Sequence, residues 1–217
     1  MGRVKDKIAL VTGGSRGIGA ETARVLAREG ATVIVTDILI DEGQAVADSI
    51  GGKFYTLDVG DESAWQKVIS SVKAEFGRLD ILFNNAGITG LNEDLGPQDP
   101  ENISLNAWHY VHKVSLDSAF LGCKYGISLM KEHGGSIINM SSRSGVVGIP
   151  AASAYASSKA AVRNHTKTVA LYCAEQAYKI RCNSLHPGAI LTPMWDLMLG
   201  TEKKKKKKMI ETVAAGV

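Results

Sequence analysis

Short apolar runs alternate with longer amphipathic segments along most of the chain. The short runs are typical of buried strands, whereas segments with apolar positions every three or four residues predict helices. Such an alternation predicts an α/β fold, in which a doubly wound parallel sheet carries helices on both faces. The predicted strands are 8–12, 32–36, 53–57, 81–84, 136–141 and 180–185, and the predicted helices are 17–29, 42–50, 62–76, 105–131 and 154–177.

A glycine-rich segment follows the first predicted strand and leads into the first predicted helix. It reads Gly13-Gly14-Ser15-Arg16-Gly17-Ile18-Gly19. A strand, a glycine-rich turn and a helix in this order favour a dinucleotide-binding loop, because the helix N-terminus presents free N–H groups to the phosphates. The spacing is Gly-x-x-x-Gly-x-Gly rather than the Gly-x-Gly-x-x-Gly of ordinary dinucleotide folds. A glycine-rich loop without a ligand is the alternative interpretation.

Tyr155 and Lys159 lie four residues apart at the start of the last predicted helix, so they share one face of it. A phenol beside an ammonium can transfer a proton, because the positive charge favours the phenolate and lowers a pKa that is otherwise near ~10. Ser142 follows the fifth predicted strand, and we expect its hydroxyl to reach the same place. The Tyr-x-x-x-Lys spacing alone also occurs by chance on many helices.

Together these segments resemble the short-chain dehydrogenase/reductase family, over nearly the whole chain. The resemblance rests on segments 12–19 and 84–87 (Asn84-Asn85-Ala86-Gly87), on Ser142 with Tyr155 and Lys159, and on Pro187-Gly188. Segments 122–124 and 134–142 are most similar to bacterial hydroxysteroid and secondary-alcohol dehydrogenases. The resemblance implies one Rossmann-like domain over residues 1–217 and a homodimer or homotetramer.

The resemblance also implies a nicotinamide dinucleotide cofactor. Asp37, at the end of the second predicted strand, can accept hydrogen bonds from both ribose hydroxyls and would repel a 2′-phosphate, which favours NAD. Arg16 favours NADP instead, and a simple turn or cap role is the alternative for Asp37. The implied cofactor-binding residues are Gly13, Ser15, Arg16, Gly17, Ile18, Gly19, Asp37, Asp58, Val59, Asn85, Ala86, Gly87, Tyr155, Lys159, Pro187, Gly188, Ile190 and Thr192.

The implied catalytic residues are Ser142, Tyr155, Lys159 and Ser115. By resemblance, Ser142 donates a hydrogen bond to the substrate oxygen, Tyr155 transfers the proton, and Lys159 lowers the Tyr155 pKa and holds the ribose. Ser115 stands where the family usually has an Asn that shapes a bend in the long helix and orders a water beside the lysine. Ser115 is therefore a candidate member of the proton relay.

The expected reaction is hydride transfer between NAD(H) and a secondary alcohol or ketone, steroid-like or alicyclic. An NADPH-dependent 3-oxoacyl thioester reductase is the nearest alternative, and a cofactor-binding protein without turnover is an alternative from another class. Asp37 argues against the first alternative, and the intact set of Ser142, Tyr155 and Lys159 argues against the second.

Composition narrows the class of protein further. The chain has 217 residues and a net charge of +3, and six lysines form one block at 203–208, so no distributed basic surface for nucleic acid is expected. No apolar run is long enough to span a bilayer, and an odd cysteine count of three favours a reducing compartment, so we expect the cytoplasm. His109 and His112 are three residues apart on one predicted helix, as two metal ligands could be. The sequence indicates no third ligand near them, so no metal site is predicted.

The end of the chain is short for the family. The family usually continues for several tens of residues past this point, so its last strand, and with it a subunit contact, is expected to be missing. Met194, Trp195 and Met198 follow Thr192, where the resemblance implies a substrate lid. A helix packed on the core is the alternative for these apolar residues.

Overall fold

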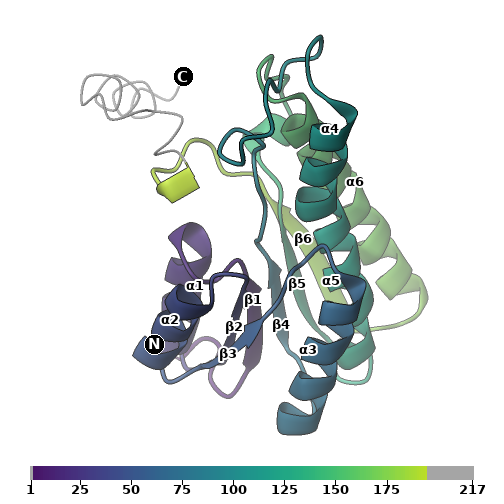
Figure 1. The fold of residues 1–217 in the computed structure, drawn as a ribbon. Helices are drawn as coiled ribbons and strands as arrows, with labels where there is room; N and C mark the ends of the chain where they lie inside the picture. The colour runs from purple at the N-terminus through teal and green to yellow at the C-terminus, as the bar shows by residue number, and fades with distance from the viewer. Residues whose placement is uncertain (1, 195–217) are drawn as a thin grey trace.

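The computed structural model describes residues 2–194 (Figure 1). The lysine block at 203–208, Trp195 and Met198 therefore lie outside the described residues. The elements in chain order are β1 Ile8–Thr12, α1 Gly17–Arg28, β2 Thr32–Asp37, α2 Ile40–Ser49, β3 Lys53–Thr56, α3 Glu62–Phe76, β4 Ile81–Asn84, α4 Leu105–His112, η1 Lys113–Asp117, α5 Ser118–Met130, β5 Gly135–Met140, η2 Arg143–Gly145, α6 Ser153–Glu175 and β6 Ile180–Leu185.

The strands form one sheet in the order β3-β2-β1-β4-β5-β6, and every neighbouring pair is parallel. Helices α1 and α2 cover one face of the sheet, while α3, α5 and α6 cover the other (Figure 1). The predicted Rossmann-like α/β class is confirmed. The strand order reverses between β1 and β4, and in such sheets ligands bind beyond the carboxyl ends of the strands at this reversal.

Two hydrophobic clusters hold the helices on the sheet, one on each face. Side chains alternate along β1, so Leu10 packs in the cluster with α3 and α5, whereas Ala9 and Val11 pack in the cluster with α1. Burial on both faces explains why the strand is a continuous apolar run. The cysteines Cys123, Cys173 and Cys182 are free, buried thiols on the α5 and α6 side.

The helix predicted over 105–131 is not continuous. It is divided into α4 and α5 by the π-helical turn η1, Lys113–Asp117. Ser115 lies at the centre of this turn, where its hydroxyl donates to the carbonyl oxygen of Ile88 (2.9 Å) and accepts from the Ile88 N–H (3.0 Å). The apolar periodicity did not reveal the turn, because a π-helical turn adds a residue without removing the apolar face on either side of it.

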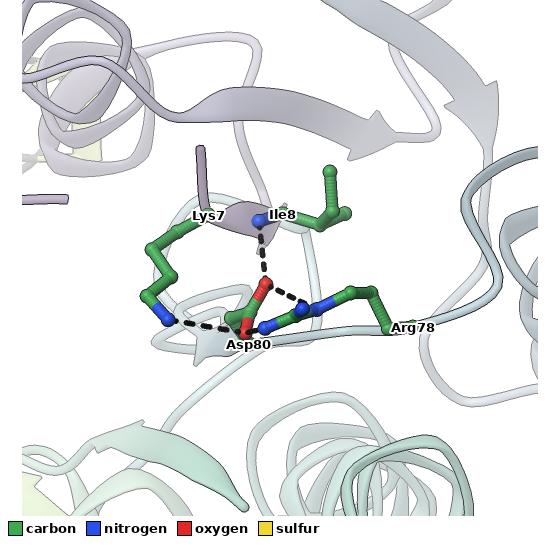
Figure 2. Close-up of polar contacts among 4 residues, drawn as sticks. All are labelled: Lys7, Ile8, Arg78 and Asp80. Carbon is green, nitrogen blue, oxygen red and sulfur yellow. Dashed lines mark hydrogen bonds and ion pairs between the residues drawn. The ribbon is translucent and has the colours of Figure 1, made fainter. Parts of the chain in front are cut away.

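Asp80 ties the amino ends of β1 and β4 together (Figure 2). Its Oδ2 accepts hydrogen bonds from the Ile8 N–H (2.9 Å) and from Arg78 Nε (3.1 Å), and its Oδ1 pairs with Arg78 and with Lys7 Nζ (3.6 Å). Burial alone would raise the Asp80 pKa, but the bonds from Arg78 and Ile8 and the two positive charges outweigh it and hold the pKa below its usual value. The cluster fixes the register of β1 beside β4 at the end of the sheet opposite the glycine-rich loop.

Candidate active site

A cavity of about 560 Å³ lies beyond the carboxyl ends of the strands. The loops after β1, β2, β3, β4, β5 and β6 all contribute to its lining. The predicted site residues among the lining are Gly13, Arg16, Gly17, Ile18, Asp37, Asp58, Val59, Asn85, Ala86, Gly87, Ser142, Tyr155, Lys159, Pro187, Gly188, Ile190 and Thr192. Ser15, Gly19 and Ser115 are the predicted site residues that lie behind this wall.

The glycine-rich loop is built for close backbone contact. A Cβ on Gly13 would lie 2.9 Å from Ala86 Cα, and a Cβ on Gly19 would lie 2.1 Å from the carbonyl oxygen of Gly13. Gly13 and Gly17 also have positive φ angles, 62° and 57°, which favour glycine. Glycines let this loop pack under the start of α1, where Gly17 and Ile18 line the cavity, and the first N–H groups of a helix have no partner within it. A dinucleotide pyrophosphate fits these groups.

Thr12 and Asn85 join the loop after β4 to the end of β1. The Thr12 hydroxyl accepts hydrogen bonds from the N–H groups of Asn85 (3.0 Å) and Ala86 (3.1 Å). The Asn85 amide donates in return to the carbonyl oxygens of Thr12 (2.9 Å) and Gly13 (3.1 Å). The two halves of the doubly wound sheet are thus held together at the floor of the cavity. Thr12 was part of the sequence motif, but this bridging role was not predicted for it.

Asp37 is at the end of β2 and lines the cavity with both carboxylate oxygens engaged. Its Oδ2 accepts from the Ser15 N–H (3.1 Å) and the Ser15 hydroxyl (2.6 Å). Its Oδ1 accepts from the N–H groups of Ile38 (2.8 Å) and Leu39 (3.2 Å). Asp37 therefore stabilises the turn after β2, which was the alternative interpretation of this residue. It also lies on the cavity wall. Arg16 is exposed and lines the same part of the cavity.

The loop after β3 supplies Asp58 and Val59 to the cavity. Val59 is 5 % exposed, and its carbonyl oxygen accepts a hydrogen bond from the buried indole of Trp65 (3.0 Å). Lys113 from η1 lies across Gly60 of the same loop, where a Cβ on the glycine would meet the lysine side chain at 2.8 Å. Gly60 therefore makes room for an exposed lysine at the edge of the cavity.

Tyr155 and Lys159 lie on the first turns of α6, and Ser142 precedes the short helix η2, so two chain segments converge on the cavity. Lys159 Nζ is 5.6 Å from the centre of the Tyr155 ring and donates to the carbonyl oxygen of Met140 (2.9 Å). Lys159 is 3 % exposed, and burial lowers its pKa to about 8. The Ser142 hydroxyl accepts a hydrogen bond from the Ser144 N–H (3.1 Å), which orients it at the start of η2.

The expectation of a lowered Tyr155 pKa is wrong for this structure. Burial raises the pKa of Tyr155, and a hydrogen bond with Ser142 offsets only part of the rise. Lys159 does not offset the rise in the Tyr155 pKa, although its Nζ, which donates to the Met140 carbonyl, lies 5.6 Å from the centre of the ring. The phenol is therefore a protonated group near neutral pH.

The proton-relay prediction for Ser115 also changes. Its single hydroxyl proton is donated to Ile88, and one of its two lone pairs accepts from the same residue. The side chain still lies near Lys159, because a Cβ on Gly87 would be 3.3 Å from Ser115 Oγ and 3.1 Å from Lys159 Nζ. The hydroxyl is thus committed to holding the backbone that follows Gly87, and it has no proton left to pass to a water.

Sequence reasoning missed the residues that close the cavity on the side away from the glycine-rich loop. They come from the irregular segments after β4, β5 and β6 and from α4 and η1, where no periodicity marks a residue as lining. Asn92, for example, donates through its amide to the carbonyl oxygen of Met194 (2.8 Å), which joins two such segments. The unpredicted lining residues include Ile88, Asn92, Glu93, Tyr110, Lys113, Arg143, Ile149 and Ala152, whereas Met194, which also lines the cavity, was expected in the substrate lid.

Comparison with known proteins agrees with this geometry. The profile described as short chain dehydrogenase matches residues 7–203. The chain belongs to the short chain dehydrogenase family. Among the residues that the structure describes, no group of three or more His, Cys, Asp or Glu side chains is placed to hold a metal ion, and no helix is long and apolar enough to cross a membrane.

Several family members are similar over most of their length. A 3-beta-hydroxysteroid dehydrogenase of Comamonas testosteroni is 42% identical over 210 residues, which cover 96% of this chain and 80% of that protein. A cyclopentanol dehydrogenase of Comamonas sp. (strain NCIMB 9872) is 45% identical over 205 residues, covering 92% and 79%. An NADP-dependent (R)-specific alcohol dehydrogenase of Lentilactobacillus kefiri is 40% identical over 212 residues, covering 95% and 82%.

Proposed function

We propose that the protein is an oxidoreductase that transfers a hydride between NAD(H) and a secondary alcohol or its ketone. The observation that carries this proposal is the convergence of Ser142, Tyr155 and Lys159 on the same cavity as the glycine-rich loop. A nicotinamide dinucleotide, when bound, supplies the hydride acceptor or donor. The protein's own task is then to orient the substrate and to move one proton.

Tyr155 is the proton donor in ketone reduction and the acceptor in alcohol oxidation. Its pKa is raised by burial, so the phenol keeps its proton near neutral pH and is ready to donate it. The Ser142 hydroxyl, oriented by the Ser144 N–H, donates to the substrate oxygen. Lys159 supplies a buried positive charge beside the phenol, and its place in the cavity lining supports the proposal that it contacts a ribose.

We propose NAD rather than NADP because the Asp37 carboxylate lines the cavity at the end of β2. A carboxylate accepts hydrogen bonds from ribose hydroxyls and repels a 2′-phosphate. The family as a whole uses either cofactor, and the relative from L. kefiri is named NADP-dependent. Arg16, on the same wall, is the residue that would favour NADP if the Asp37 carboxylate were removed.

An alicyclic or steroid-like substrate fits the apolar part of the lining. Ile88, Ile149, Ala152 and Met194 line the cavity together with the catalytic residues. Two relatives are named for a steroid and for cyclopentanol, which supports the same substrate class. The thioester reductase and the binding protein without turnover are not favoured, because the similar relatives are alcohol dehydrogenases and the catalytic residues share one cavity.

Assembly and location stay predictions. A homodimer or homotetramer is supported by exposed apolar side chains on the outer helices, such as Leu105 on α4, Phe120 on α5 and Leu171 on α6, which are 69%, 48% and 66% exposed. Light scattering of the purified protein tests the assembly. A cytoplasmic location rests on the odd cysteine count and on the lack of a long apolar run in the sequence, and it is tested by fractionating cells.

A substrate screen with a matched pair of variants tests the function. Wild-type protein is assayed with cyclic alcohols, hydroxysteroids and their ketones, using NAD(H) and NADP(H). Tyr155→Phe should lose about 10²-fold or more in kcat while its NADH affinity stays near that of wild type, because the phenol moves a proton and does not hold the cofactor. Tyr125→Phe is the control and should keep full activity, because Tyr125 lies half-buried between α5 and α3 and does not line the cavity. A loss below tenfold in Tyr155→Phe would remove this residue from the mechanism.

A further inference from the structure

Ser15 is the predicted cofactor-binding residue that contacts Asp37 instead of lining the cavity. It is 6 % exposed, and both of its donors, the backbone N–H and the hydroxyl, bond to one oxygen of the Asp37 carboxylate. The hydroxyl contact, at 2.6 Å, is short, as expected when the acceptor is charged. Among the described residues, the carboxylate has no other side-chain partner.

Four donors surround this carboxylate, and three of them belong to the backbone. The N–H groups of Ile38 and Leu39 bond to Oδ1, and the N–H of Ser15 bonds to Oδ2. These three are also part of the loop geometry and would persist in any serine variant. The Ser15 hydroxyl is therefore the one contact that a side-chain substitution removes, and it holds Oδ2 toward the glycine-rich loop.

We propose that Ser15 is a positioning residue for cofactor discrimination: it holds the Asp37 carboxylate at the cavity wall, where it meets ribose hydroxyls and repels a 2′-phosphate. The inference rests on the proposed NAD preference. Without the hydroxyl, Oδ2 keeps only the longer contact with the Ser15 N–H, while Oδ1 keeps its two backbone contacts. The carboxylate is then held less firmly at the cavity wall, and a 2′-phosphate beside Arg16 is rejected less strongly.

Binding measurements test this inference without relying on turnover. Dissociation constants for NADH and NADPH are measured by fluorescence titration for wild type, Ser15→Ala, Ser15→Thr and Ser128→Ala. Ser15→Ala should lower the ratio Kd(NADPH)/Kd(NADH) by about tenfold or more, the size expected for one hydrogen bond to a charged group. Ser15→Thr keeps the hydroxyl and should restore most of the ratio. Ser128→Ala, an exposed serine on α5 that bonds only its own helix, should leave the ratio unchanged.

A double-mutant cycle with Asp37→Ala separates the possible outcomes. If Ser15 acts through the carboxylate, Ser15→Ala should not change the ratio further in the Asp37→Ala background. An equal change in both backgrounds, or an equal loss of affinity for both cofactors, would overturn the positioning role, because the serine would then contact the cofactor directly. If Asp37→Ala itself leaves the ratio unchanged, or if wild type binds NADPH more tightly, the proposed NAD preference fails instead.

Discussion

Replacing Lys159 by methionine should make the protein more stable while abolishing turnover. Lys159 is 3 % exposed, and within residues 2–194 its ammonium group has one hydrogen bond, to the Met140 carbonyl oxygen at 2.9 Å. Burial lowers its pKa from 10.5 to about 8, so the folded protein carries a destabilised charge. Methionine has a similar length and flexibility without the charge, so it can occupy the same space.

The magnitude follows from the pKa. The difference between 10.5 and about 8 corresponds to about 3 kcal/mol of destabilisation of the charged form in the folded state. Losing the hydrogen bond to the Met140 carbonyl costs about 1 kcal/mol in return. The net gain is therefore about 2 kcal/mol at pH 7, which corresponds to a rise in Tm of about 4–8 °C for a chain of this size.

The pH dependence identifies the cause of the gain. The folded-state pKa lies below the unfolded-state pKa, so between about pH 8 and 10.5 the unfolded wild-type protein binds more protons than the folded protein. Wild-type stability contributed by Lys159 therefore rises with pH across this window. The advantage of Lys159→Met should be full below about pH 8 and should shrink toward pH 10.

Urea unfolding at pH 7 and pH 9.5 measures both effects. Lys167→Met, an exposed lysine two turns further along α6, is the control and should change the free energy of unfolding by less than about 0.5 kcal/mol. A Lys159→Met variant that is less stable than wild type at pH 7, or whose advantage is the same at both pH values, would refute the view that the lysine is held at a cost in stability.

Three further outcomes are expected. Asp80→Asn should lower the free energy of unfolding by about 1–2 kcal/mol at neutral pH, because Arg78 and Lys7 lose their charged partner. Since the folded-state pKa of Asp80 is lowered, the difference in unfolding free energy between wild type and variant, measured in urea, should shrink as the pH falls through that pKa. Ser115→Ala should destabilise the protein by about 1–3 kcal/mol and reduce kcat, because it leaves the N–H and carbonyl of Ile88 unpaired. Ser115→Asn should retain most activity, and equal activity in wild type and both variants would contradict the view that Ser115 holds the backbone after Gly87. Alcohol oxidation should accelerate with rising pH in stopped-flow assays while ketone reduction stays nearly constant around neutrality, because burial keeps Tyr155 protonated; a flat oxidation profile would argue against this phenol as the acceptor.

The order of strands and helices could be predicted from the sequence because it depends on local pattern. A run such as Ile8–Thr12 is apolar on both faces, and this is enough to place it inside a sheet covered on two sides. The glycine spacing from Gly13 to Gly19 likewise identifies a loop that tolerates positive φ angles and close contacts. Tyr155 and Lys159 share a helix face because four residues make about one turn, so their proximity needed no tertiary information.

The properties of these residues were decided only by the tertiary structure. The Tyr155 pKa rises instead of falling, because solvent exclusion depends on how α6 packs against the loops after β4 and β5. Ser15 and Ser115 lie behind the cavity wall, where they bond to Asp37 and Ile88. The sequence could not reveal these contacts, because the partners are 22 and 27 residues away along the chain. Side chains such as Ile149 line the cavity from irregular loops that have no period. Local pattern determines which elements form, whereas solvation and hydrogen-bond partners arise from contacts between distant segments and are set only when the chain is packed.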